Sequence, residues 1–357
     1  IWERIAKDIM ARIEDSDPLK KAAFRLAMWI GYNAARSRLR PGRSKPALHW
    51  RILQYIAYWL SHRHVLDKVG LKRVKRAYTG GAMIADDYIY FFHALGVNLK
   101  QIYGQTEIAG IAVVHPDDDV RPDTVGKPLP LTEIRIAEDG EILLRSPAMM
   151  KGYYGNPEAT AKTLKDGWLH TGDVGALTED GHLVIHDRAK EILTLADGTK
   201  VAPQIVQNKL KFSPYIAEAA VIGEGRPYLV AILNIDFETV SRWAERRKIT
   251  FTSYADLSQK PEVLALLKRE VKRANSRLPE KMRVKRFASL VKEFHPDDEE
   301  MTRTRKLRRM VIEKRYASLI EAMYRGESEH TMDIIMRLED GRIVTARRSI
   351  AIVSVED

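Results

Sequence analysis

Residues 71–107 read LKRVKRAYTGGAMIADDYIYFFHALGVNLKQIYGQTE, and this stretch decides the fold class. Residues 71–79 resemble a strand with basic neighbours, and the two glycines that follow favour a turn. Residues 83–95 carry apolar side chains at helical spacing, and residues 97–103 again resemble a strand. A strand, a glycine turn, a helix and a second strand in this order predict an α/β unit with a parallel sheet.

Helices are expected before this unit, and short strands after it. Apolar residues recur at helical spacing in residues 2–13 and 52–64, with a basic loop rich in Pro and Gly between them at residues 37–46. Residues 111–185 hold short alternating runs separated by Asp-Gly turns. This pattern predicts a small antiparallel, barrel-like β region.

The C-terminal half predicts a compact α+β domain. Residues 216–222 and 228–235 are apolar and predict two adjacent strands. Helices are expected over residues 237–247, 261–277 and 309–324. Residues 331–355 predict a β-hairpin that turns at residues 339–341.

Composition narrows the classes of protein that this chain can represent. A length of 357 residues leaves room for two or three domains. The absence of cysteine excludes disulfides, a cysteine nucleophile and a thiolate zinc site. The longest apolar-rich run is residues 52–60, well short of the about 20 residues that a membrane-spanning helix needs. The absence of cysteine does not fix the compartment, and we expect a cytoplasmic protein that either stays in solution or contacts a membrane peripherally.

The net charge points to an anionic partner. There are 59 Lys and Arg against 48 Asp and Glu, a net charge of +11. No basic-aromatic motif with RNA-binding spacing is present, so we expect no nucleic acid partner. The basic residues of 36–51 and 72–76 either contact an anionic membrane peripherally or form a solvated surface.

Two motifs carry side chains suited to a nucleotide. Tyr-Gly-Gln-Thr-Glu at residues 103–107 follows a predicted strand, and ligands bind beyond the carboxyl ends of parallel strands. An aromatic ring can stack on a base there, and a carboxylate can hold Mg²⁺. Thr-Gly-Asp at residues 171–173 places a carboxylate after a glycine turn, where it can accept both hydroxyls of a ribose. Each motif alone also fits a turn without a ligand.

Two charged segments complete the pattern. Asp-Arg-Ala-Lys-Glu at residues 187–191 falls where the β region gives way to the α+β domain. Residues 302–309 are strongly basic. Taken alone, the first also fits a solvated linker and the second a solvated surface.

The order and spacing of these four segments resemble the AMP-forming adenylating enzymes. This superfamily includes acyl-CoA synthetases, the adenylation domains of peptide synthetases and the firefly luciferase group. Residues 103–107, 187–203 and 213–229 are most similar to the long-chain acyl-CoA synthetase branch. The resemblance implies that residues 1–189 are the C-terminal part of the large AMP-binding domain. Residues 190–325 would be the small mobile domain, and residues 326–357 an added β-hairpin tail.

The resemblance also implies roles for single residues. Tyr103 would stack on adenine, Thr106 would contact the α-phosphate, and Glu107 would help to hold Mg²⁺. Asp173 and Arg188 would bind the ribose hydroxyls. The residues implied to bind the nucleotide are Gly80, Gly81, Ala82, Tyr103, Gly104, Gln105, Thr106, Asp173 and Arg188. Those implied in catalysis and movement are Thr106, Glu107, the mobile lysine Lys306 and the hinge Lys190.

The implied reaction is the ATP-dependent activation of a long-chain fatty acid. An acyl-adenylate forms with release of pyrophosphate, and CoA then takes the acyl group, giving acyl-CoA and AMP. The lysine would leave and a segment around Gly198 would arrive as the small domain rotates between the two steps. Two alternatives remain: a ligase for another carboxylate, such as an aryl or amino acid, and a non-catalytic fragment that binds AMP or lipid.

The sequence departs from the family pattern at three places. The family's Ser/Thr/Gly-rich phosphate loop, which ends in Pro-Lys-Gly, is nowhere in the chain. It normally lies upstream, so we expect this polypeptide to represent the later part of an enzyme and to form no acyl-adenylate alone. Gln204 and Gln207 stand where relatives often carry acidic residues, and His186 where a small or apolar residue is more usual.

Overall fold

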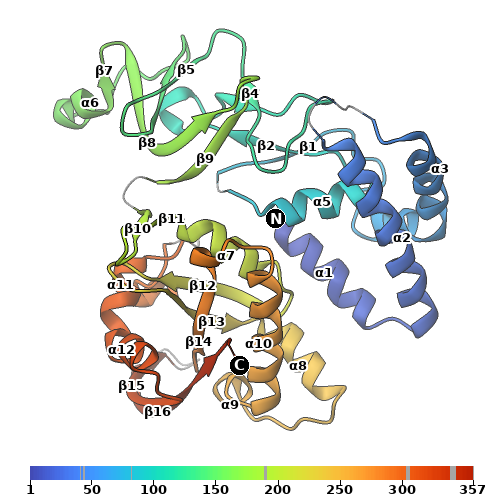
Figure 1. The fold of residues 1–357 in the computed structure, drawn as a ribbon, viewed down its shortest axis with the longest axis vertical. Helices are drawn as coiled ribbons and strands as arrows, with labels where there is room; N and C mark the ends of the chain where they lie inside the picture. The colour runs from blue at the N-terminus through green and yellow to red at the C-terminus, as the bar shows by residue number, and fades with distance from the viewer. Residues whose placement is uncertain are drawn as a thin grey trace. The chain divides into compact units, whose positions relative to one another are not determined.

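The computed structural model describes residues 1–40, 42, 45–81, 83–188, 191–302, 306–337 and 343–356. It divides into two compact units, Ile1–Glu191 and Ile192–Asp357 (Figure 1). Residues 189 and 190, which include the predicted hinge Lys190, lie outside the described residues. Among the described residues, no helix combines the length and hydropathy that crossing a bilayer requires.

The first unit begins with helices and then forms the predicted strand–helix–strand unit. The helices are α1 (Trp2–Glu14), α2 (Pro18–Arg38), α3 (Leu48–Ala57), the π-helical turn η1 (Tyr58–His62) and α4 (Arg63–Lys68). The elements that follow are β1 (Ala77–Thr79), α5 (Asp86–Leu95), β2 (Leu99–Tyr103) and the 3₁₀ turn η2 (Thr106–Ile108). α5 ends at Gly96, whose φ of 92° lies in the left-handed region that favours glycine.

Strands β1 and β2 are parallel, with Ala77 opposite Leu99, so the α/β prediction is confirmed. β3 (Val113–Val114) and β4 (Lys127–Pro128) extend the sheet antiparallel, in the order β1-β2-β3-β4. The first strand is shorter than the sequence predicts. Most of residues 71–76 are exposed, and burial begins only at Ala77.

An antiparallel sheet completes the first unit. Its elements are β5 (Glu133–Ile136), β6 (Glu141–Arg145), α6 (Pro157–Thr163), β7 (Leu164–Lys165), β8 (Trp168–Leu177) and β9 (Leu183–Arg188). The order is β5-β6-β8-β7, with β9 also paired to β8. Ile142, Leu144 and Leu169 from this sheet share one buried core with Ile108 and Val113. This core holds the residues after β2 against β8.

The second unit is an α+β domain around a five-stranded sheet. Its elements are β10 (Leu193–Thr194), β11 (Lys200–Val201), α7 (Pro203–Lys211), β12 (Ile216–Ile222), β13 (Leu229–Ile235), α8 (Phe237–Glu245), α9 (Tyr254–Ser258), α10 (Pro261–Asn275), η4 (Glu280–Met282), β14 (Val284–Ser289), η5 (Pro296–Asp298), α11 (Arg309–Arg315), α12 (Ala317–Arg325), β15 (Glu329–Arg337) and β16 (Ile343–Ser354). The sheet order is β12-β13-β14-β16-β15, and β12 pairs with β13 as predicted.

Helices cover both faces of this sheet (Figure 1). Val206 of α7 and Leu267 of α10 pack on one face, and Ile312 of α11 and Leu319 of α12 on the other. Every residue of β13 is buried, as expected for a central strand.

Two features of the second unit were not visible in the sequence. The helix predicted over residues 309–324 breaks at Tyr316, whose buried hydroxyl donates to Glu300 Oε1 at 2.7 Å. The tail forms the expected antiparallel hairpin, and β16 also pairs with β14, with Val353 opposite Phe287. The tail hairpin is thus built into the sheet. Its expected turn at residues 339–341 lies outside the described residues.

Candidate functional site

The predicted residues of the first unit meet where β1 and β2 end. Because these strands are parallel, Gly80 and Gly81 after β1 lie at the same sheet edge as Tyr103 at the end of β2. A Cβ on Gly80 would lie 2.4 Å from Ile102 Cγ1, and Gly81 has φ of 83°, so both positions favour glycine. Ala82 lies outside the described residues.

A hydrogen-bonded cluster joins the two predicted nucleotide motifs. The Tyr103 hydroxyl donates to Asp173 Oδ2 at 2.7 Å, and Gln105 Nε2 donates to the same oxygen at 2.9 Å. Gln105 Nε2 also donates to the Thr171 carbonyl at 2.9 Å. Asp173 is only 8% exposed. Tyr103 and Asp173 are 70 positions apart in the sequence. Residues that lie far apart along the chain therefore form one polar cluster.

The Thr-Gly-Asp segment, expected at a turn, lies within β8, and its neighbours hold it in place. Thr171 Oγ1 donates to the Ile142 carbonyl at 2.7 Å and accepts from Asp173 N at 3.1 Å. Glu141 accepts from Gly172 N at 2.8 Å through Oε1 and contacts His170 Nδ1 at 2.8 Å through Oε2. The Asp173 carboxylate is thus positioned before any ligand arrives. The sequence assigned Glu141 no role.

Arg188 stands opposite Asp173 in the β8–β9 ladder. The two residues implied to bind ribose are therefore register partners on adjacent antiparallel strands. The side chain of Arg188 lies outside the described residues.

Glu107 lies after β2 with its carboxylate bonded to a second tyrosine. Tyr153 Oη donates to Glu107 Oε1 at 2.7 Å, and this hydrogen bond is the main reason that the pKa of Tyr153 is raised. The main-chain oxygen of Glu107 accepts from Met150 N at 2.8 Å. Thr106, beside it, is exposed. One carboxylate beside an exposed threonine hydroxyl suits Mg²⁺, which takes one or two carboxylates together with substrate phosphates.

Gly104 turns the chain between these two groups. A Cβ at Gly104 would lie 2.3 Å from the Gly110 carbonyl oxygen. Any larger residue would push the loop carrying Gln105 and Thr106 away from the end of β2.

Lys306 belongs to the second unit. Its N–H donates to Thr302 Oγ1 at 3.0 Å and its carbonyl accepts from Thr302 N at 2.7 Å, within a short loop closed by the bridge between Met301 and Leu307. Lys306 is exposed, and residues 303–305 lie outside the described residues. Gly198 turns between β10 and β11 with φ of 82°.

Comparison with known proteins assigns this arrangement to a family. Residues 34–154 match the model of the AMP-binding enzyme, and residues 190–328 match that of the AMP-binding enzyme C-terminal domain. The chain belongs to the AMP-binding enzyme family. Both matched models and the names of the curated relatives agree with the resemblance to the AMP-forming acyl-CoA synthetases.

Two curated relatives illustrate the match. The long-chain-fatty-acid–CoA ligase FadD15 of Mycobacterium bovis is 36% identical over 254 residues, covering 71% of this chain and 42% of that protein. The putative fatty-acid–CoA ligase fadD11 of Mycobacterium tuberculosis is 33% identical over 335 residues, covering 92% of this chain and 57% of that protein. The chain thus spans about half the length of the curated relatives it matches.

A solved structure supports the fold. The adenylation domain of a carboxylate reductase from Mycobacterium chelonae aligns with a TM-score of 0.59 and 23% identity, covering 85% of this chain and 45% of that chain. At this identity the likeness shows the fold alone, and it agrees with the predicted α/β class.

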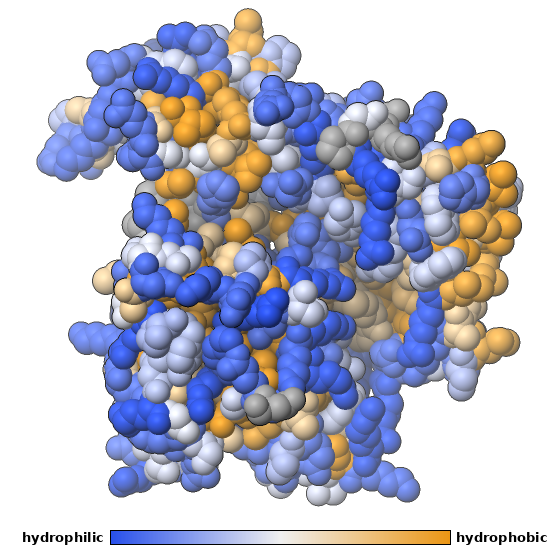
Figure 2. All heavy atoms as spheres, in the orientation of Figure 1, coloured by the Kyte–Doolittle hydropathy of each residue, from blue (hydrophilic) through white to orange (hydrophobic). Residues whose placement is uncertain are grey.

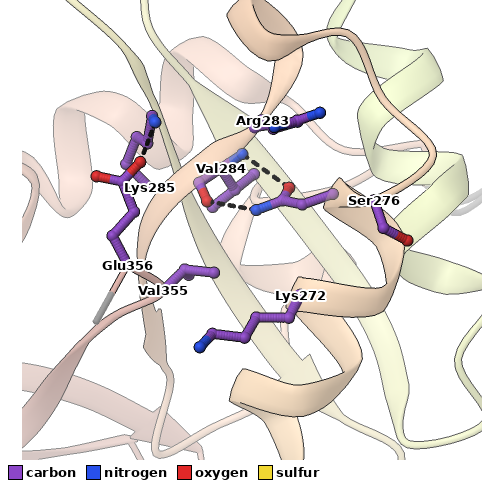
Figure 3. Close-up of a pocket in the computed structure, with 8 residues that line it drawn as sticks. Lys272, Ser276, Arg283, Val284, Lys285, Val355 and Glu356 are labelled. Atoms are coloured by element: carbon purple, nitrogen blue, oxygen red, sulfur yellow. Dashed lines mark hydrogen bonds and ion pairs between the residues drawn. The ribbon is translucent and has the colours of Figure 1, made fainter.

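A pocket of about 420 Å³ lies in the second unit (Figure 3). It lies between the end of α10, the start of β14 and the end of β16, and its lining includes Lys272, Arg283 and Lys285. Asn275 braces it by bonding both main-chain polar groups of Val284, and Glu356 pairs with Lys285. None of the residues predicted from the sequence lines this pocket.

Of the four buried histidines described in the first unit, three have a lowered pKa, which sequence reasoning missed. Burial lowers the pKa of His62 and of His93 to about 4, and that of His115 to about 3. Within the described residues, His62 Nε2 and His93 Nδ1 have no hydrogen-bond partner. His115 accepts from Gln101 N at 3.0 Å and shares Thr124 Oγ1 with His182. In the sequence, only the position of His62 on one side of a predicted helix could have indicated a buried histidine.

The lowered pKa values of these histidines predict that the folded state becomes less stable in acid. Their folded pKa values lie below the unfolded value of about 6.5, so the unfolded chain binds more protons and stability falls as pH drops from 6.5 toward 4. We expect the free energy of unfolding to fall by about 2 kcal/mol per histidine between pH 7 and 5, measured by urea unfolding. His62→Gln should reduce this pH slope, whereas His64→Gln, at an exposed position two residues further along, should leave it unchanged. A slope identical in all three proteins would contradict the assignment.

Proposed function

We propose that this chain serves an ATP-dependent long-chain fatty acid–CoA ligase that works through an acyl-adenylate. The observation that carries the proposal is the cluster in which Tyr103 and Gln105 both donate to Asp173 Oδ2. It links the segment suited to adenine and phosphate with the carboxylate suited to ribose. The names of the relatives, which are long-chain fatty acid ligases, supply the substrate class.

The chemistry needs positioning and charge stabilisation. A carboxylate is a poor electrophile because its leaving group would be oxide, and attack on the α-phosphorus of ATP replaces that leaving group with AMP. Asp173 would hold the ribose and Tyr103 the adenine, so that the α-phosphate lies beside Thr106. Bound at Glu107, Mg²⁺ would neutralise charge on the phosphates.

The second unit would contribute a different residue to the site in each of the two steps. Lys306 would donate to the carboxylate and α-phosphate oxygens while charge moves between them. The CoA thiol then attacks the acyl carbonyl, forms the thioester bond and displaces AMP. In the proposal, rotation about Lys190 exchanges Lys306 for the turn at Gly198 between these steps.

A narrower version of the proposal concerns the isolated chain. Because the phosphate-loop motif is missing from its sequence, we propose that the polypeptide alone binds AMP and acyl-adenylate but does not make acyl-adenylate from ATP. Activation of an aryl or amino acid is the second candidate function, supported only by the shared adenosine chemistry.

Calorimetry tests both parts. AMP and a non-hydrolysable palmitoyl-adenylate analogue should both bind, and 2′,3′-dideoxy-AMP should bind at least about tenfold more weakly than AMP. The reason is that hydrogen bonds to a charged group contribute about 1.5–3 kcal/mol, and Asp173 would lose two of them. ATP–pyrophosphate exchange should stay at background. Equal affinity for the two nucleotides would overturn the assignment of Asp173, and robust exchange would overturn the narrower version.

A further inference from the structure

The helical run from Leu48 to His62 is apolar on two sides. One side packs on α2, where Trp50, Leu53 and Ala57 meet Ala27 and Ile30. The opposite side carries large apolar residues that are 45–69% exposed, and we call it the apolar face: Leu48, Ile52, Tyr55, Ile56, Trp59 and Leu60. Figure 2 shows this concentration of apolar side chains over α3. Large apolar side chains that are exposed together in one patch usually mark an interaction site.

Aromatic rings are prominent on this surface. Trp59 lies 6.3 Å from Tyr55 between ring centroids and carries the Arg63 guanidinium 4.6 Å above its ring. Trp29 of α2 is also 59% exposed, and it contacts Trp50, on the packed side of the run, edge-on at 5.8 Å. Tyr and Trp have an apolar body and a polar edge and concentrate where a membrane meets water.

Basic residues predominate in the segment that carries the apolar face, although Lys20 pairs with Asp17, and Lys21 and Arg25 pair with Glu14. Residues 18–66 contain no Asp and no Glu. The same segment holds the cations Lys20, Lys21, Arg25, Arg36, Arg38, Arg40, Arg43, Lys45, Arg51 and Arg63. Arg36, Arg40, Lys45 and Arg51 are exposed. An apolar helix face with aromatic residues and a cationic border is typical of helices that lie in the membrane interface.

We propose that the apolar face docks onto an anionic phospholipid bilayer. Leu48, Ile52 and Trp59 would enter the headgroup region, while Lys45 and Arg51 contact lipid phosphates. A second copy of this chain is a poorer occupant, because a two-fold contact would oppose two segments that both lack acidic residues. The inference does not depend on the adenylation chemistry, since no residue of the Tyr103–Asp173 cluster takes part.

Vesicle co-sedimentation tests the proposal on the intact chain. We expect binding to vesicles of mixed phosphatidylcholine and phosphatidylglycerol, and much weaker binding to phosphatidylcholine alone. The difference should shrink at high salt, because salt screens contacts between exposed charges. Equal binding to the two vesicle types would overturn the proposal.

Matched variants locate the contact. Tyr55→Ser with Trp59→Ser should weaken vesicle binding about tenfold or more through lost apolar insertion. Leu131→Asn is the control, because Leu131 is 80% exposed in the same unit and its φ of 64° suits Asn. Lys45→Gln with Arg51→Gln should weaken binding to anionic vesicles about fivefold per charge. Lys162→Gln with Lys165→Gln removes the same charge elsewhere in the unit and should change nothing.

Two results would contradict the proposal. One is unchanged vesicle binding by both pairs of variants, which are surface changes whose folding circular dichroism can verify. The other is a dimer, seen by light scattering, that Trp59→Ser dissociates. That result would assign the apolar face to a second copy.

Discussion

Lys306→Ala should remove ATP-dependent acyl-adenylate formation while largely sparing thioester formation. In a protein that carries the phosphate loop ahead of this chain, we expect adenylation to fall about 100- to 1,000-fold, the 2.7–4 kcal/mol that one lost donor costs in comparable sites. Thioester formation from supplied acyl-adenylate and CoA should stay within about threefold, since the lysine has left the site in that step. Pyrophosphate exchange measures the first step, and chromatography of acyl-CoA measures the second.

Arg308→Ala is the matched control for Lys306→Ala. Arg308 is exposed, lies two positions further along the same basic segment and carries the same charge. If the segment acts only as a positive surface, both variants should impair adenylation equally. If Lys306 contacts the reacting oxygens, only its variant should do so. Equal loss of both half-reactions in Lys306→Ala would contradict its assignment.

Local patterns predicted the elements of the fold, and long-range contacts decided their ends. Two glycines and a helical apolar period sufficed to predict the parallel β1–β2 pair. The break at Tyr316 was not predictable, because it coincides with a buried hydrogen bond to Glu300, which lies in another loop. The pairing of β16 with β14 joins strands about 65 residues apart, as the register of Phe287 with Val353 shows, and no local signal specifies such a pairing.

The candidate site likewise contains residues that the sequence predicts and residues that it does not. Tyr103 and Asp173 could be selected from sequence because Tyr103 ends a predicted strand, Asp173 follows a glycine, and the family pattern couples them. Glu141 and Tyr153 could not, because their roles are contacts with groups 31 and 46 residues away. Each is a side chain that holds a predicted group in place, and no spacing rule in the sequence marks such a residue.

Asp173→Asn should lower AMP affinity about 10- to 100-fold. In the protein, Tyr103 and Gln105 both donate to Asp173 Oδ2. An asparagine can satisfy these donors only by turning its carbonyl toward them, which leaves an NH₂ group where ribose hydroxyls need an acceptor. The lost charge-assisted hydrogen bonds contribute about 1.5–3 kcal/mol. Calorimetry with AMP and with 2′,3′-dideoxy-AMP measures the effect, which should vanish for the dideoxy nucleotide.

Tyr103→Phe separates binding from packing in this cluster. Phenylalanine keeps a ring that can stack on adenine and removes only the donor to Asp173, so AMP affinity should fall by less than about tenfold. The double variant should lose less than the sum of the two single losses, because both act on one oxygen. Strict additivity would mean that Tyr103 and Asp173 bind the nucleotide independently. If Asp173→Asn instead lowers folding stability and leaves AMP affinity unchanged, the cluster only stabilises the fold. The ribose assignment would then be wrong.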